Sequence, residues 1–366
     1  MQLGLALEYS LGHITHAQNL QLHLSGLPTM QPRAIRLAYD SKDQWWQRLP
    51  GVRSNWSLRA SLGARIFLLK HLAGTKGLFF HSQVTSLLST DLMHRIPSVV
   101  SLDATPLQYD QLGASYQHAT GSASVERIKK RLNVRSFTSA SSLVTWSEWA
   151  KASLVNDYGI APSKVTVIPP GIDVQTWHFP ERDVHQPVQL LFVGGDFYRK
   201  GGATLLAAWE RLSPKVRQRA TLHIVTKTDN IRQGIPGVHL HYGLVPNSPE
   251  LMALYRAASA FVFPSDGDCL PLSVLEALAS GLAVLTTDVA ALPEAVEHNR
   301  CGLILPPADV MAWSSALEQV ITDHAIRRAW GREARVVAES RFDANVTYKR
   351  LVRVISGEDI ACQLAA

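Results

Sequence analysis

The sequence predicts an α/β protein with two doubly wound domains, each built on a parallel sheet. Three observations favour this fold class. Short apolar segments alternate with helical patterns along both halves of the chain, which is typical of βαβ units. A stiff turn at Pro169-Pro170-Gly171 separates the two halves. With 366 residues, the chain is long enough for two domains with full cores.

The strands expected in the first half are short and apolar, and each is followed by polar residues. Helices are expected to begin at about Thr15 and at Glu148. Right-handed crossovers between such strands give a parallel sheet. We expect this N-terminal domain to span residues 1–168, with strands at residues 3–8, 77–80, 98–102, 143–146 and 164–168.

The second half repeats the alternation in a C-terminal domain expected at residues 174–340. Further helices run from about Asp323 to Val354, and a C-terminal helix within residues 341–366 is expected to cross back to the first domain. The domain's strands are expected at residues 189–193, 221–225, 238–242, 260–263 and 283–286, and its helices at residues 202–212, 249–258 and 309–323.

Composition favours a globular protein that works in a reducing compartment. Hydrophobic residues make up 46% of the chain and charged residues 18%, which excludes an intrinsically disordered protein. The three cysteines, Cys269, Cys301 and Cys362, form neither a metal motif nor a disulfide framework. No apolar run reaches the ~18 residues that cross a bilayer, and the N-terminus does not read as a signal peptide. We therefore expect a cytoplasmic protein.

The most informative segment is the strand–loop–helix junction at residues 260–277. An apolar strand ends at Phe263, and a polar loop containing Asp268 leads into a helix that carries Glu276. A helix that begins at the carboxyl end of a strand exposes free N–H groups, which bind phosphate. The two carboxylates could bind hydroxyl groups. Phosphate and hydroxyls together indicate a nucleotide-sugar.

Each acidic residue of this junction also has a simpler interpretation. Asp268 could cap the following helix, and Glu276 could be an exposed helical glutamate. Asp266 and Asp268 also form an Asp-x-Asp pair, which could hold a divalent metal ion. We discount a metal because the sequence offers no further clustered carboxylate as a partner ligand.

A second glycine-rich segment, at residues 192–202, also follows a strand and opens a helix. Its glycines let the backbone approach a ligand closely, and Lys200 supplies a positive charge for phosphate. The segment matches neither the P-loop pattern nor the dinucleotide-binding pattern. The alternative is an ordinary glycine-rich turn in which Arg199 and Lys200 are solvated.

The second half resembles the retaining glycosyltransferases of family 4, or group 1, with the GT-B fold. That fold consists of two Rossmann-like domains that face each other across a cleft. The resemblance is specific over residues 141–307 and only topological before them. It rests on Gly194 with Lys200 and Gly201, on Gly171-Ile172-Asp173, on Asp268 and Glu276-Ala277 separated by seven residues and followed by Gly281, and on Leu292-Pro293-Glu294 and residues 299–303.

The resemblance implies a role for each matched position. Lys200 would neutralise the diphosphate leaving group, Asp268 would contact the donor sugar, and Glu276 would accept hydrogen bonds from the ribose hydroxyls. Gly12, in the first loop of the N-terminal domain, would allow close approach to the phosphates or the acceptor. The remaining substrate-binding positions are the loop residues Gly194, Gly195 and Gly201 and the segment Cys269, Leu270 and Leu272, where the backbone N–H groups of Leu270 and Leu272 would hold sugar and phosphate oxygens.

Two positions depart from the family pattern. The arginine that follows the first glycine is replaced by Gly195, and Arg199 could supply the missing charge from another direction. Where the family often has a histidine near the donor sugar, this sequence has Asp103 after the strand at residues 98–102. We rank Asp103 as the catalytic candidate above His81, which ends the preceding strand.

The segment at residues 125–132 is a basic, weakly amphipathic helical pattern in the first half. Such a helix can sit on anionic lipid, but a charged run is more often simply a solvated surface. The net charge of +6 suits anionic ligands or an anionic membrane equally. Peripheral contact with the inner face of a membrane therefore remains open.

The resemblance implies a metal-independent, retaining transfer of a sugar from a nucleoside-diphosphate sugar to an acceptor hydroxyl. The expected partners are that donor and a hydroxyl-bearing acceptor, with no cofactor and no nucleic acid. Because the family arginine and histidine are replaced, a non-catalytic nucleotide-sugar-binding protein or partner subunit is the alternative. A phosphorylase that uses free phosphate is a further one.

Overall fold

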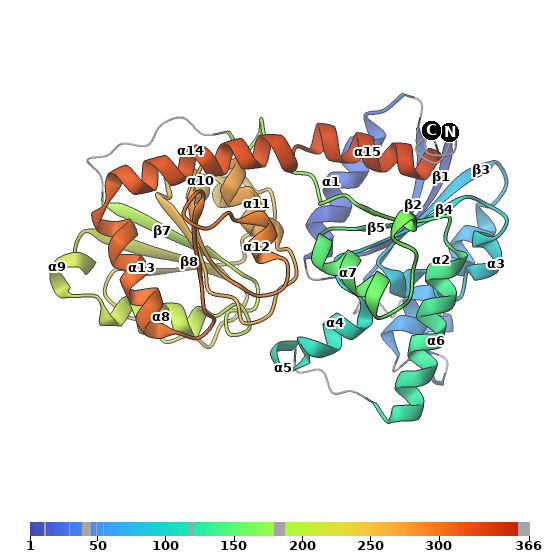
Figure 1. Ribbon diagram of the computed structural model, residues 1–366, viewed down its shortest axis with the longest axis horizontal. Coiled ribbons are helices and arrows are strands. Elements are labelled where there is room, and N and C mark those ends of the chain that lie inside the picture. The colour runs from blue at the N-terminus through green and yellow to red at the C-terminus, as the bar shows by residue number, and fades with distance from the viewer. Residues whose placement is uncertain are drawn as a thin grey trace. The chain divides into compact units, whose positions relative to one another are not determined.

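A computed structural model describes residues 1–10, 12–28, 30–38, 45–48, 50–53, 55–116, 121–178 and 187–357, so Leu11 and Cys362 lie outside the described part. The chain divides into two compact units (Figure 1). The first unit comprises Met1–Gly113, His118–Gly171 and Ala344–Ala366, and the second comprises Ala114–Gln117 and Ile172–Asp343.

The first unit is built on a six-stranded parallel sheet in the order β2-β1-β3-β4-β5-β6. Neighbouring strand residues point to opposite faces, so Leu5 and Ala6 belong to different core clusters. The strands are β1 (Gln2–Glu8), β2 (Gln31–Leu37), β3 (Thr75–His81), β4 (Ser98–Leu102), β5 (Ser142–Thr145) and β6 (Val165–Val167).

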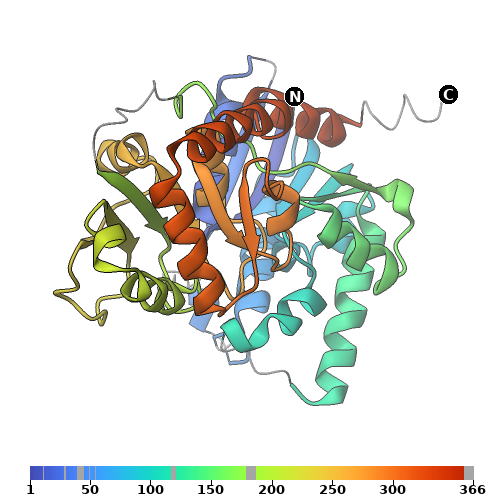
Figure 2. The same ribbon diagram turned by 60° about the vertical axis from the view of Figure 1, so that its left-hand side comes forward.

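Helices cover both faces of this sheet. One core cluster joins the sheet to α1 (His13–Ser25) and α15 (Ala344–Ser356), and Figures 1 and 2 show α15 beside α1. The other cluster joins the sheet to α2 (Trp56–Lys70), α6 (Ala123–Ser139) and α7 (Glu148–Asn156). Shorter elements connect them: η1 (Trp45–Arg48), η2 (Gln83–Thr85), α3 (Thr90–Met93), α4 (Pro106–Gln111) and η3 (Pro162–Lys164).

The second unit has its own six-stranded parallel sheet, in the order β12-β11-β10-β7-β8-β9. Two pairs of helices pack together on it, α8 with α13 and α11 with α14. Its strands are β7 (Val188–Val193), β8 (Ala220–Thr226), β9 (Val238–Tyr242), β10 (Ala260–Phe263), β11 (Ala283–Thr287) and β12 (Gly302–Leu305). Its helices are α8 (Gly202–Arg211), α9 (Pro214–Arg217), α10 (Pro249–Ala257), α11 (Leu272–Ala279), α12 (Leu292–Ala295), α13 (Val310–Thr322) and α14 (His324–Arg341), together with α5 (Gly113–Tyr116) from Ala114 onward.

The stiff turn at Pro169-Pro170-Gly171 lies where the chain leaves the first unit. The backbone N–H of Ile172 donates to the carbonyl oxygen of Phe342 over 2.8 Å, and Ile172 pairs with Asp343. The segment in which the chain enters the second unit, at Ile172, therefore runs beside the segment in which it leaves that unit, at Phe342 and Asp343. Among the described helices, none combines the length and the apolar character that a bilayer span requires.

Candidate functional site

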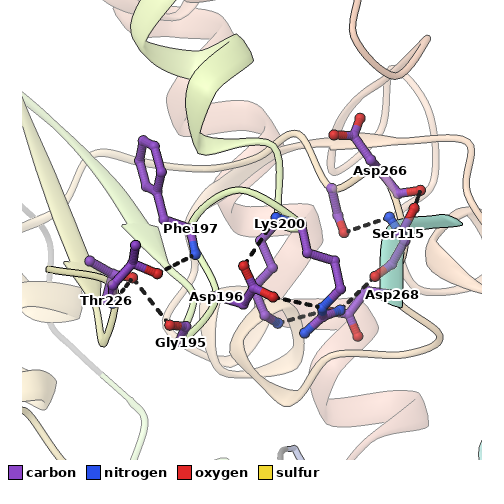
Figure 3. Close-up of polar contacts among 12 residues, drawn as sticks. Ser115, Gly195, Asp196, Phe197, Lys200, Thr226, Asp266 and Asp268 are labelled. Carbon is purple, nitrogen blue, oxygen red and sulfur yellow. Dashed lines mark hydrogen bonds and ion pairs between the residues drawn. The ribbon is translucent and has the colours of Figure 1, made fainter. Parts of the chain in front are cut away.

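The glycine-rich loop of the second unit follows β7 and ends at the start of α8. Gly201 has a φ of 73°, and a Cβ there would lie 1.7 Å from the carbonyl oxygen of Pro264. This position therefore requires glycine. The hydroxyl of Thr226 donates to the carbonyl oxygen of Gly195 over 3.3 Å and the amide of Lys227 donates to the same oxygen, so the loop is fixed against β8 (Figure 3).

Gly194 and Gly195 differ in the space around them. A Cβ on Gly194 would lie 2.5 Å from Cδ of Lys200, so a larger residue would displace the lysine side chain. A Cβ on Gly195 would meet nothing closer than Lys227, at 3.7 Å. The position where the family has an arginine, Gly195, therefore has space for a side chain. At Gly194 the absence of a side chain leaves the room that Lys200 occupies.

Two cations of this loop converge on one carboxylate. Lys200 Nζ lies 2.5 Å from Asp268 Oδ2, and an Arg199 guanidinium nitrogen lies 3.5 Å from the same oxygen (Figure 3). The Arg199 guanidinium also donates to the carbonyl oxygen of Gly267 over 2.6 Å. Burial alone would raise the pKa of Asp268, but Lys200 and Arg199 outweigh it and the pKa is lowered. Asp268 is therefore a carboxylate.

These contacts rule out the simpler interpretations of three residues. The side chains of Arg199 and Lys200 are only 8% and 14% exposed, so they are not a solvated pair. Asp268 does not cap the helix, because α11 begins after Pro271, where no side chain caps it. The two cations are instead held by the buried Asp268 and, for Arg199, also by the half-exposed Asp196, whose Oδ2 lies 3.4 Å from Arg199 Nε.

The helix that follows the loop carries Glu276 on its buried side. Glu276 is 5% exposed, so the interpretation as an exposed glutamate is wrong. The hydroxyl of Tyr255, from α10, donates to Glu276 Oε2 over 3.0 Å. Burial raises the pKa of Glu276 to about 7, although the Tyr255 hydrogen bond lowers it. No sequence pattern singled out Tyr255, which comes from another helix.

The segment between the two acids supplies backbone groups. The amide of Cys269 donates to the Asp268 carboxylate, and the Cys269 carbonyl oxygen accepts from the amide of Ala291. Leu272 is the first residue of α11, and such an N-terminal amide has no acceptor within its own helix. The side chains of Leu270 and Leu272 are buried. For Leu270 and Leu272, the groups that can meet a ligand are therefore those of the backbone.

A short segment, Ala114–Gln117, also belongs to the second unit. The hydroxyl of Ser115 donates to the carbonyl oxygen of Asp266 over 3.0 Å (Figure 3). The guanidinium carbon of Arg199 lies 4.4 Å above the ring of Tyr116, a cation–π contact. Nothing in the local sequence indicates these contacts, because they join residues more than 80 positions apart.

In the first unit, the candidates Asp103 and His81 lie on either side of a third residue, His13. His13 Nδ1 is 2.8 Å from His81 Nε2, and His13 Nε2 is 3.7 Å from Asp103 Oδ2. His81 is completely buried, and burial, with help from His16 and His13, holds its pKa well below the ordinary value. Asp103 is 22% exposed, so it meets solvent whereas His81 does not.

Gly12 immediately precedes this histidine, at the start of α1. Its φ is −68°, which any residue adopts, and a Cβ there would find no heavy atom within 4 Å. Neither backbone conformation nor packing therefore requires glycine. Within the described residues, no group of three or more His, Cys, Asp or Glu side chains is arranged to hold a metal ion.

Comparison with known proteins places both units in one family. A model described as Glycosyltransferase Family 4 matches residues 36–176, and one described as Glycosyl transferases group 1 matches residues 187–323. A glycogen synthase from Mycobacterium tuberculosis is 31% identical over 210 residues, which are 55% of this chain and 50% of the relative. The chain thus spans about half the length of curated relatives such as this one.

Solved structures show the same fold over nearly the whole chain. Sucrose-phosphate synthase from Thermosynechococcus elongatus has a TM-score of 0.74 at 17% identity, covering 99% of this chain and 100% of that chain. Anabaena HepE in complex with UDP-glucose has a TM-score of 0.71 at 14% identity, covering 97% of this chain and 99% of that chain. At these identities the likeness concerns the fold alone, and the predicted fold class is confirmed. The chain belongs to the group 1 glycosyltransferases, also called family 4, with the GT-B fold.

Proposed function

We propose that the protein transfers a sugar from a nucleoside-diphosphate sugar to an acceptor hydroxyl, with retention of the anomeric configuration. The observation that carries this proposal is the buried cluster of Lys200, Arg199 and Asp268 beside the start of α11. Two cations held out of water are suited to a diphosphate, whose charge increases when its bond to the sugar breaks.

In the structure, Asp268 is the partner of Lys200 and contacts Arg199. A donor diphosphate would replace Asp268 as the partner of Lys200, and the freed carboxylate could then accept hydrogen bonds from the sugar. Arg199 is also tied to the carbonyl oxygen of Gly267, which would hold it in place during the exchange. Charge that is already in place typically contributes several kcal/mol to the transition state. The leaving phosphate can itself take the acceptor's proton, so this scheme needs no separate base.

Glu276 is the proposed ligand of the donor's ribose. Tyr255 holds one carboxylate oxygen, which fixes the direction of the other. A carboxylate oriented in this way can accept hydrogen bonds from vicinal hydroxyls. The backbone amides at the start of α11 lie between Asp268 and Glu276 in the sequence, where the diphosphate of the same ligand would lie.

UDP-glucose is the first donor to test. HepE, which shares the fold, has been solved in complex with UDP-glucose. The proposed chemistry requires no metal or cofactor, because Lys200 and Arg199 supply the positive charge that a divalent ion would otherwise supply.

A thermal-shift screen with the glucose esters of uridine, guanosine and adenosine diphosphates tests the proposal. A ligand at a hundred times its Kd stabilises the folded state by about 2.7 kcal/mol, so the correct donor should raise the melting temperature clearly. Lys200→Ala should abolish the shift, and Lys215→Ala, an exposed lysine in α9, should retain it. A shift that survives Lys200→Ala would contradict the assignment of the diphosphate site.

The replacement of the family arginine by Gly195 favours a second candidate, a binding protein without turnover. It would give the same thermal shifts, but neither transfer to an acceptor nor hydrolysis of the donor. Turnover by the purified protein would exclude it.

We also propose peripheral contact between α6 and anionic lipid. Val125 and Ile128 are 45% and 56% exposed on this helix. Arg127, Lys130 and Arg131 are exposed in the same turns. Apolar side chains among exposed cations suit the headgroup region of an anionic membrane. A solvated helix surface is the alternative.

A further inference from the structure

The inference concerns the short segment Ala114–Gln117, whose described residues belong to α5. This segment is part of the second unit, although the residues before and after it in the sequence belong to the first. Its contacts with the second unit come from Ser115 and Tyr116, and both involve the residues around the Lys200–Asp268 cluster. The segment is therefore placed to influence that cluster.

Ser115 holds the segment against the loop that carries Asp268. Its hydroxyl donates to the carbonyl oxygen of Asp266 over 3.0 Å (Figure 3). A Cβ on Gly267 would lie 2.5 Å from Cβ of Ser115, so this close approach requires glycine at position 267. The segment thus packs directly on the backbone beside Asp268.

Tyr116 covers one face of the Arg199 guanidinium, whose central carbon lies 4.4 Å from the ring centroid. A nitrogen at the edge of the same guanidinium donates to the carbonyl oxygen of Gly267 over 2.6 Å and lies 3.5 Å from Asp268 Oδ2. The face and the edge of this planar group are therefore both held. A guanidinium binds phosphate through donors that lie in its plane, so the orientation of the plane decides where those donors point.

We propose that Tyr116 positions Arg199 for the diphosphate of the donor, so that ligand binding and docking of the segment strengthen each other. When the diphosphate replaces Asp268, Tyr116 and the carbonyl oxygen of Gly267 still hold the guanidinium. Coupled events of this kind strengthen each other by the same factor. The inference rests on the proposed function and adds a positioning residue to it.

A double-mutant cycle tests whether Tyr116 acts through Arg199. Tyr116→Leu keeps an apolar side chain but removes the ring, and should raise the Kd for UDP about fivefold, the size of a cation–π contact. Tyr116→Phe retains the ring and should stay within about twofold of the original Kd. In an Arg199→Met background, Tyr116→Leu should change the Kd by less than about twofold, because the partner of the ring is gone. Equal weakening in both backgrounds would contradict the positioning role.

Hydrogen exchange tests the reciprocal effect of the ligand on the segment. Saturating UDP should slow the exchange of the amides at residues 113–116 in the original protein, and should not slow it in Arg199→Met. Unchanged exchange in the original protein would overturn the inference. Tighter binding of UDP by Tyr116→Leu would also overturn it, because the segment would then exclude the ligand.

Two further arms keep this inference separate from the proposed function. UDP binding that is lost in Lys200→Ala but unchanged in Tyr116→Leu would contradict the inference alone. Inorganic diphosphate is the second probe, because it carries the charge without a nucleoside or a sugar. Diphosphate binding that weakens in Tyr116→Leu, without binding of UDP or UDP-glucose to the original protein, would support the inference and contradict the proposed function.

Discussion

Glu276 is a residue of the second unit whose ionisation is coupled to folding. Burial raises its pKa from 4.5 to about 7, despite the opposing hydrogen bond from Tyr255. Between these two values the folded protein holds a proton that the unfolded chain has lost. The free energy of unfolding contributed by this group therefore falls as the pH rises from 4.5 through about 7.

Glu276→Gln should remove this pH dependence. We expect the original protein to lose on the order of 2 kcal/mol relative to the Gln variant between pH 5 and pH 8. Chemical denaturation of both proteins at the two pH values measures the difference. A constant difference between the two proteins would show that Glu276 titrates near its ordinary pKa.

For single residues, the sequence motifs identified the candidate site residues but not the residues that they contact. The spacing of Lys200 and Asp268 follows a motif, and the structure brings the two together at 2.5 Å. Tyr255 and His13 were missed because they contact the candidate residues from separate elements. A tyrosine in an amphipathic helix and a histidine after a strand have no distinctive local pattern.

Among the elements, α15 carries the end of the described chain into the core of the first unit. Tyr348 is buried, and its hydroxyl donates to the carbonyl oxygen of Gly171 over 3.3 Å. Leu351 and Val354 pack in the same cluster as β1 and α1. The helix is therefore part of the first unit's hydrophobic core.

Leu351→Ala should destabilise the first unit by about 2–5 kcal/mol, the usual effect of removing a buried leucine side chain. Val346 is on the same helix but 49% exposed, so Val346→Ala should change stability by less than about 0.5 kcal/mol. Urea denaturation compares the two. Equal effects would mean that α15 is not held in the core as described.

The membrane contact of α6 is tested with vesicles. Replacing Arg127, Lys130 and Arg131 by glutamine should reduce cosedimentation with vesicles containing phosphatidylserine, because each basic residue near an anionic surface contributes about 1 kcal/mol. Vesicles of phosphatidylcholine alone should bind neither protein. Identical binding of the original and substituted proteins to anionic vesicles would support the solvated-surface alternative.

Elements with clear periodicity were predicted well, and the others were missed. The predicted strands at residues 98–102, 238–242 and 260–263 coincide with β4, β9 and β10. β2 was missed because it is an edge strand with Pro32 and two arginines, only partly buried. α2 and β12 were also missed. The edge strand β9 was predicted all the same, because its apolar residues alternate with histidines, so an edge position alone did not hide β2.

For the whole molecule, the sequence predicted two doubly wound units, and the solved relatives confirm the GT-B fold. The family motifs lie in the second unit, where the Lys200–Asp268 cluster was predicted as a site. The first unit is less specific in sequence, and its cluster around His13 emerged only from the structure.

Sugar transfer by Lys200 and its neighbours is tested most directly by turnover of UDP-glucose. Release of UDP, with and without glucose as acceptor, should be measured for the original protein, Lys200→Ala and the control Lys215→Ala. The original protein and the control should release UDP at equal rates. Lys200→Ala should be at least about a hundredfold slower, as expected when preorganised charge worth several kcal/mol is removed. Equal rates for Lys200→Ala and the original protein would contradict the role of Lys200 in the reaction.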